Sequence, residues 1–153
     1  MHLEKLIKQT APFKSPYAKA EVGLIYLGNV IISQSQNNFK PHGITLQQYN
    51  VLRILRGQYP KYANINLIKE RMLDKMCDAS RIVERLHKQE LILKQVNALD
   101  KRHTDVIITE KALALLKKID EHQELQVNIL NTLNQDEVNS FNQLISKVLG
   151  SLL

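Results

Sequence analysis

The chain has 153 residues, 44% of them hydrophobic and 24% charged, with a formal net charge of +6; these values are typical of one compact globular subunit and exclude a disordered chain. The single cysteine excludes an intramolecular disulfide and a cysteine-based zinc finger. Because the N-terminus has no secretory signal pattern and no run of about 18 apolar residues occurs, we expect a cytoplasmic protein without a membrane partner.

The positive charge is concentrated in the middle of the chain. Residues 53–103 carry twelve lysines and arginines against six acids, whereas residues 104–153 carry four against seven. A basic excess of this kind favours a polyanionic partner, with nucleic acid ahead of a membrane surface. We therefore expect a polyanion to bind the middle of the chain.

The first long helix is predicted over residues 17–39, after a loop at 10–17 that contains two prolines. Its apolar residues cover a wider arc than a single helix can bury. One row of them consists of Leu24, Leu27 and Ile31. A second helix is predicted to begin at Thr45, because Thr45 and Gln48 have the spacing of a capping box.

Two shorter helices are predicted near residues 66–72 and over 78–89, with a break at 73–77. Asp78 falls in the first turn of the later helix, where the helix dipole favours an acid. That helix has a basic face at positions i, i+4 and i+7, formed by Arg81, Arg85 and Lys88. Two short helices joined by a turn, the second with a basic face, are the pattern of a helix-turn-helix.

The periodicity then changes to that of strands. Apolar residues within 91–96 and at 106–108 predict a β-hairpin, and the polar segment between them carries Lys101 and Arg102. An α-helix fits the major groove of DNA, where arginine bonds guanine bidentately, and a basic hairpin tip can reach the minor groove. The combination favours a DNA-binding surface over an ordinary solvated helix face.

Two further helices are predicted at the C-terminal end, over residues 110–133 and 135–152. The last one has apolar residues in a 3-4-3-4 spacing, which is a heptad-like seam. This seam consists of Val138, Phe141, Ile145, Val148 and Leu152.

No arrangement of residues points to catalysis. The glycines are not clustered as in a phosphate-binding loop, and the five histidines are scattered, so we expect no enzyme activity, no metal and no cofactor. Cys77 lies at the start of the basic helix, where a helix N-terminus lowers a thiol pKa, so a reactive thiolate is one interpretation. The other, which we favour, is a small residue in a tight turn.

Residues 70–116 resemble the MarR family of winged helix-turn-helix transcription regulators. The resemblance is carried by Ser80, Arg81, Arg85 and Leu86 in the basic helix, by Asp100, Lys101 and Arg102 at the hairpin tip, and by Ile108, Thr109 and Ala112. Glu90 departs from the pattern, because the family usually has glycine at that helix end, so we expect the turn there to be built differently. The implied fold is mainly α with a small β-hairpin wing.

The resemblance implies a winged helix-turn-helix DNA-binding domain at 45–109 and a helical dimerisation region formed by 1–44 and 110–153. The first and last helices would form the dimer through Leu24, Leu27, Ile31, Val138, Phe141, Ile145, Val148 and Leu152. The residues facing DNA would be Asn64, Asn66, Asp78, Ala79, Ser80, Arg81, Arg85, Lys88, Asp100, Lys101 and Arg102.

The expected function is sequence-specific regulation of transcription. A homodimer would bind a pseudo-palindromic site on double-stranded DNA, as a repressor released by a small-molecule effector. The alternatives are a winged-helix module that binds proteins and not DNA, an enzyme subunit, and an RNA-binding protein.

Overall fold

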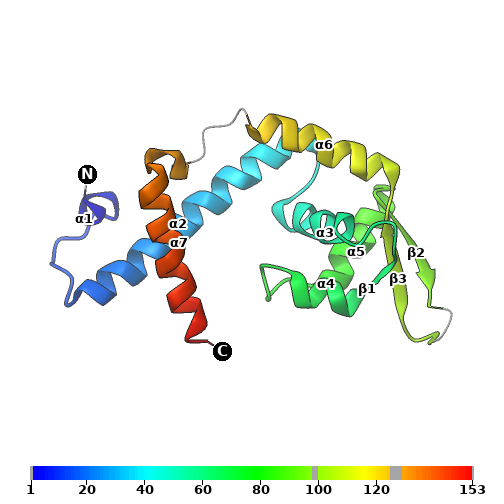
Figure 1. The fold of residues 1–153 in the computed structure, drawn as a ribbon, viewed down its shortest axis with the longest axis horizontal. Coiled ribbons are helices and arrows are strands. Elements are labelled where there is room, and N and C mark those ends of the chain that lie inside the picture. Colours follow the sequence, from blue (N-terminus) through cyan, green and yellow to red (C-terminus); the bar gives the residue numbers. More distant parts are fainter. Residues whose placement is uncertain (1, 98–99, 125–128, 153) are drawn as a thin grey trace. The chain divides into compact units, whose positions relative to one another are not determined.

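The computed structural model describes residues 2–97, 100–124 and 129–152, and for 122–124 it gives the backbone alone. The described elements run in the order α1 (Leu3–Leu6), α2 (Pro16–Phe39), the 3-10 turn η1 (Lys40–His42), α3 (Leu46–Arg56), β1 (Ala63–Asn64), α4 (Ile65–Arg71), α5 (Ala79–Lys88), β2 (Ile92–Val96), β3 (Thr104–Ile108), α6 (Glu110–Glu124), the 3-10 turn η2 (Ile129–Thr132) and α7 (Gln135–Gly150). They form two compact units, 1–120 and 121–153 (Figure 1). The expected fold class, mainly α with a small β wing, is confirmed.

In the first unit, α2 is a long helix with little buried surface of its own. Ser15 caps its N-terminus, where the Ser15 hydroxyl accepts a hydrogen bond from the N–H of Ala18 at 3.2 Å. Phe39, the last residue of α2, is its one buried residue. The chain then turns through η1 and through Gly43, whose φ of +70° is a left-handed conformation that glycine adopts without strain.

The helix-turn-helix is formed by α4 and α5, which pack against α3. The predicted capping box at the start of α3 is confirmed: the Thr45 hydroxyl accepts from the N–H of Gln48, and the Gln48 side chain accepts from the N–H of Thr45. Helix α4 is capped by the Asn64 side chain, which accepts from the N–H of Leu67 at 2.8 Å. Helix α5 begins one residue later than predicted, because Asp78 is its N-cap residue and not part of its first turn.

The wing is a three-stranded antiparallel sheet in the order β1-β3-β2. The predicted hairpin is confirmed by the pairing of β2 with β3, in which Ile92 lies opposite Ile108 and Val96 lies opposite Thr104. The third strand, β1, was not predicted; its two residues, 63 and 64, pair with Val106 and Asp105 of β3. This pairing attaches the wing to the N-terminus of α4.

One hydrophobic core holds this unit together. It is formed by one face each of α3, α4, α5 and α6 and by one side of the sheet. Leu52, Ile68, Leu86 and Leu116 have no exposed surface. Burying one side chain of this size stabilises the fold by roughly 1.5–3 kcal/mol relative to leaving it exposed. The core therefore fixes α5 and the wing on one scaffold.

The C-terminal part of the chain, from residue 110 onward, differs from the sequence prediction in two places. The helix predicted over 110–133 ends at Glu124 in the described part, residues 125–128 lie outside the described residues, and 129–132 form a 3-10 turn. Helix α7 ends at Gly150, two residues before the predicted end. It begins with a capping box between Asn134 and Glu137 that was not predicted. Within the described parts of the chain, no helix combines the length and the apolar character needed to cross a membrane.

Candidate nucleic-acid interface

Helix α5 presents a row of polar and basic side chains to solvent. Ser80, Arg81, Arg85 and Lys88 are exposed, while the opposite side of the helix enters the core. The carboxylate of Asp78 accepts a hydrogen bond from the N–H of Arg81 at 3.2 Å, which satisfies one of the free donors at the helix N-terminus. The exposed arginines therefore project from a helix whose own backbone is capped.

One of the expected contact residues is placed elsewhere. Ala79 has no exposed surface and packs in the hydrophobic core. Its side chain cannot reach a ligand on the α5 surface, so the prediction of a DNA-facing role for Ala79 is wrong. The helical period explains the error, because Ala79 lies four residues before Val83 and seven before Leu86, both of which are buried.

The C-terminal end of α5 is built around Glu90. The N–H of Leu91 donates to the carbonyl of Leu86 at 3.0 Å, and the N–H of Glu90 donates to the carbonyl of His87 at 2.9 Å. These two bonds form a Schellman motif, which requires a left-handed residue. Glu90 adopts this conformation with a φ of +60°, although it is not a glycine. The turn therefore has the usual hydrogen bonds of a glycine-terminated helix.

At the wing tip, Asp100 organises the basic residues. Its carboxylate accepts two hydrogen bonds from the Arg102 guanidinium, from Nε at 3.1 Å and from Nη2 at 3.0 Å, and one from the Arg102 N–H at 3.0 Å. These bonds hold the pKa of Asp100 below its usual value. The Arg102 side chain is nevertheless 88% exposed, and Lys101 is exposed beside it. The tip thus offers an oriented guanidinium to a partner.

The two asparagines predicted at the start of α4 differ in what their side chains can offer a partner. Asn64 is exposed, but its Oδ1 caps α4. Asn66 is exposed in the first turn of the helix. The side-chain amide nitrogens of Asn64 and Asn66 are the parts of this pair suited to donate to a phosphate.

Two residues that were not predicted as part of the site lie next to α5. Thr45 and Gln47, at the start of α3, line a hollow of about 300 Å³ together with Arg81 and Arg85. The capping box marked Thr45 as a helix start, but its closeness to α5 depends on how α3 and α5 pack. The candidate surface therefore includes the N-terminus of α3 as well as α5.

Cys77 lies in the same hollow and is protected by a neighbour. Its thiol donates a hydrogen bond to the Asp74 carboxylate, with 2.8 Å between Sγ and Oδ2. This bond, followed by partial burial, raises the pKa of Cys77 to about 11. The structure favours the interpretation of Cys77 as a turn residue, because a reactive cysteine needs a lowered pKa.

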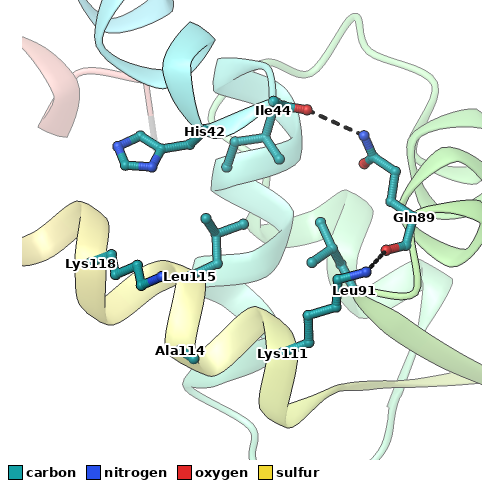
Figure 2. Close-up of a pocket in the computed structure, with 9 residues that line it drawn as sticks. His42, Ile44, Gln89, Leu91, Lys111, Ala114, Leu115 and Lys118 are labelled. Atoms are coloured by element: carbon teal, nitrogen blue, oxygen red, sulfur yellow. Dashed lines mark hydrogen bonds between the residues drawn. The ribbon is translucent and has the colours of Figure 1, made fainter.

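A second, larger hollow lies beside the C-terminal end of α5 (Figure 2). It has a volume of about 590 Å³, which is in the range of small-molecule sites. Apolar side chains of Ile44, Leu91 and Leu115 line it. The Lys111 ammonium at its margin donates to the carbonyl of Gln89 at 2.9 Å and to the Glu90 carboxylate at 3.1 Å.

The residues predicted to form a dimer are not buried within the chain. In α2, Leu24 and Ile31 are exposed and Leu27 is half-buried. In α7, Ile145 and Val148 are exposed, as is Leu152 just beyond the helix. Val138 and Phe141 are half-buried. Each helix therefore carries an apolar row that the chain itself leaves open to solvent.

Among the described residues, no group of three or more histidines, cysteines or acids is placed to hold a metal ion. Asp78 serves instead as the cap of α5. An ion pair joins Glu84 of α5 to Lys94 of β2. It ties the wing to the helix that carries the arginines.

No family model matches the chain. The regulator MgrA of Staphylococcus aureus, described as an HTH-type transcriptional regulator, is 25% identical over 115 residues, which cover 75% of this chain and 76% of that protein. MhqR of Bacillus subtilis, also described as an HTH-type transcriptional regulator, is 24% identical over 110 residues, covering 70% and 73%.

Solved structures share the fold along most of the chain. The MarR-family regulator AbsC of Streptomyces coelicolor matches with a TM-score of 0.76 at 16% identity, over 93% of this chain and 98% of AbsC. The complex of S. aureus MepR with DNA matches with a TM-score of 0.74 at 18% identity, over 88% and 98%. The organohalide-sensing regulator RdhR in its 2,4-dichlorophenol-bound form matches with a TM-score of 0.80 at 15% identity, over 94% and 87%.

Proposed function

We propose that this chain, which has the winged helix-turn-helix fold of the MarR family of transcription regulators, binds double-stranded DNA as a homodimer and represses transcription from a pseudo-palindromic site. Residues 45–109 would form the DNA-binding domain, and residues 1–44 and 110–153 the dimerisation region. The recognition helix would be α5, and the hairpin of β2 and β3 would be the wing.

The observation that carries this proposal is the pairing of two exposed basic elements on one scaffold. Arg81 and Arg85 project from a capped helix, and Arg102 projects from the tip of a wing whose strand β2 is tied to the same helix by an ion pair. Arginine on a helix reads guanine in the major groove, and arginine on a wing fits the negative potential of the minor groove. The MepR–DNA complex, which has the same fold, lends further support.

A homodimer would supply two such surfaces. The open apolar rows of α2 and α7 are the surfaces that a second copy would bury. Two recognition helices related by a two-fold axis bind half-sites one helical turn apart, which is about 34–36 Å. The site on DNA should then be an inverted repeat, and affinity should fall steeply with salt as lysines and arginines release counterions.

The hollow of about 590 Å³ is the candidate site for an effector. Lys111 at its margin bonds the last turn of α5 through Gln89 and Glu90 (Figure 2). A small molecule bound there would change the position of α5 relative to α6. If it binds the DNA-free form more tightly, it shifts the population away from the DNA-bound form. RdhR, which binds 2,4-dichlorophenol, shares this fold.

The test is to select bound duplexes from a random pool with the purified protein. Recovery of an inverted repeat, bound with nanomolar affinity at physiological salt, supports the proposal. Recovery of no preferred duplex, together with no binding at low salt, contradicts it. The second result would favour the alternative, a winged-helix module that binds protein.

A further inference from the structure

The turn between α4 and α5 exposes two large apolar side chains. Met76 is 94% exposed and Leu73 is 85% exposed. Among the large apolar residues described, Tyr17 alone, at 86%, has a value between these two. Single exposed apolar residues are common on protein surfaces. These two, however, are only three residues apart in one short turn, and they precede the helix that carries Arg81 and Arg85.

The backbone of this turn is held firmly by hydrogen bonds. The N–H of Leu73 donates to the Asn50 side chain of α3 at 3.0 Å. The Asp74 carboxylate accepts from the N–H of Met76 at 3.0 Å and from the Cys77 thiol at 2.8 Å. The turn is thereby fixed against α3, and it presents the two apolar side chains from a defined backbone.

The turn lies directly before the helix that carries the arginines. Met76 lies two residues before Asp78, the N-cap of α5. Exposed lysines and arginines surround the turn in sequence, at Lys69, Arg71, Lys75 and Arg81.

The charge around the turn is a small excess of basic residues. Glu70, Asp74 and Asp78 lie in the same stretch as the four lysines and arginines, and a carboxylate that accepts hydrogen bonds from an N–H or a thiol keeps its negative charge. The wider segment, residues 53–103, carries twelve lysines and arginines against six acids. A polyanion is the partner that matches this excess.

We propose that Leu73 and Met76 contact the 5-methyl groups of thymines in the major groove, at the edge of the site that α5 reads. This inference rests on the proposed function. Neither side chain can bond a phosphate, and the thymine methyl is the one apolar group that a base pair presents in the major groove. Methionine is flexible enough to follow such a group. The two residues thus give the protein a preference for A·T pairs beside the half-site.

The test uses a duplex recovered by selection, in which each thymine is replaced in turn by deoxyuridine. This change removes the methyl group and keeps every base-pair hydrogen bond. For the wild type, at least one replacement in each half-site should weaken binding about fourfold, the value of one buried methyl-sized group. In the double variant with Met76→Gln and Leu73→Gln, the same replacement should leave the binding affinity unchanged. Met76→Leu, which keeps an apolar side chain, should retain the sensitivity.

Each result separates this inference from the proposed function. If the wild type binds the duplex but no thymine is sensitive, or if sensitivity is unchanged in the glutamine variant, the methyl contact is disproved and DNA binding stands. Equal weakening on every duplex would place the two side chains on the DNA backbone and would also overturn the inference. A variant that binds DNA normally but loses self-association would assign the turn to a protein contact. If the wild type binds no duplex, both proposals fail.

Discussion

Gln48 and Gln89 are joined by a hydrogen bond of 3.0 Å between Gln48 Nε2 and Gln89 Oε1, which connects the start of α3 to the end of α5. Gln48 is only 5% exposed, and its Oε1 accepts from the N–H of Thr45 at 2.9 Å. Gln89 in turn donates to the carbonyl of Gly43 at 3.2 Å (Figure 2). One buried amide thus serves both the cap of α3 and the placement of α5.

Replacing Gln48 by methionine should lower the free energy of unfolding by about 1–3 kcal/mol, because it removes the capping box and leaves polar groups unpaired. The measurement is urea unfolding. Gln89→Met is the matched variant, since it breaks the shared bond and keeps the capping box; it should cost less. Equal stability of Gln48→Met and wild type would contradict this role of Gln48.

Glu90→Gly should stabilise the fold. A left-handed conformation costs a non-glycine residue about 1–2 kcal/mol, and glycine adopts it without that strain. The ion pair with Lys111 that is lost contributes little, because both side chains are more than half exposed. We expect a gain of about 1 kcal/mol in urea unfolding. Glu90→Ala keeps the strain and loses the ion pair, so it should show no gain; a less stable glycine variant would contradict the account.

Cys77 should react slowly with iodoacetamide at pH 8, because its pKa is raised to about 11 by the bond to Asp74. Asp74→Asn, which removes the negative acceptor, should speed alkylation by at least about tenfold. Folding raises this pKa, so the bond's contribution to stability is complete below the ordinary thiol value of 9.0 and is lost as the pH rises toward about 11. Fast alkylation of the wild type at pH 8 would show that the thiol is not protected.

Arg81→Ala and Arg102→Ala should each weaken binding to a selected duplex by about 1–3 kcal/mol and leave self-association unchanged. The affinity is measured by fluorescence anisotropy at several salt concentrations. Lys117→Ala removes the same charge from an exposed position on α6 and is the control. If all three variants bind alike, the arginines act only through net charge, and the assignment of α5 and the wing as contact elements is wrong.

Helices α3 and α5 and the hairpin were predictable because their signals are local. The Thr45–Gln48 capping box, the apolar stripe of α5 and the alternation in β2 each depend on residues close in sequence. Strand β1 could not be found in this way, because two residues show no periodicity and pair only with the distant β3. The hollow beside α5 could not be predicted for the same reason, because the residues that line it come from separate helices.

Two errors have a physical cause in single residues. Ala79 was assigned to the DNA surface by its place in a family pattern, but its position on the α5 face that carries Val83 buries it in the core. Glu90 was expected to force a different turn, yet it adopts the left-handed conformation and the turn keeps its usual bonds. For Ala79 the packing of the core decides the position, and for Glu90 the hydrogen bonds of the turn prevail over the preference of non-glycine residues.

We propose that two paired chains bind one double helix through their basic surfaces, and native mass spectrometry of the protein mixed with a selected duplex measures this stoichiometry. We expect a complex of two chains with one duplex, and its loss in the Arg81→Ala and Arg102→Ala double variant, which should remain a dimer. A complex of one chain with one duplex, or free protein alone at low salt, would contradict it.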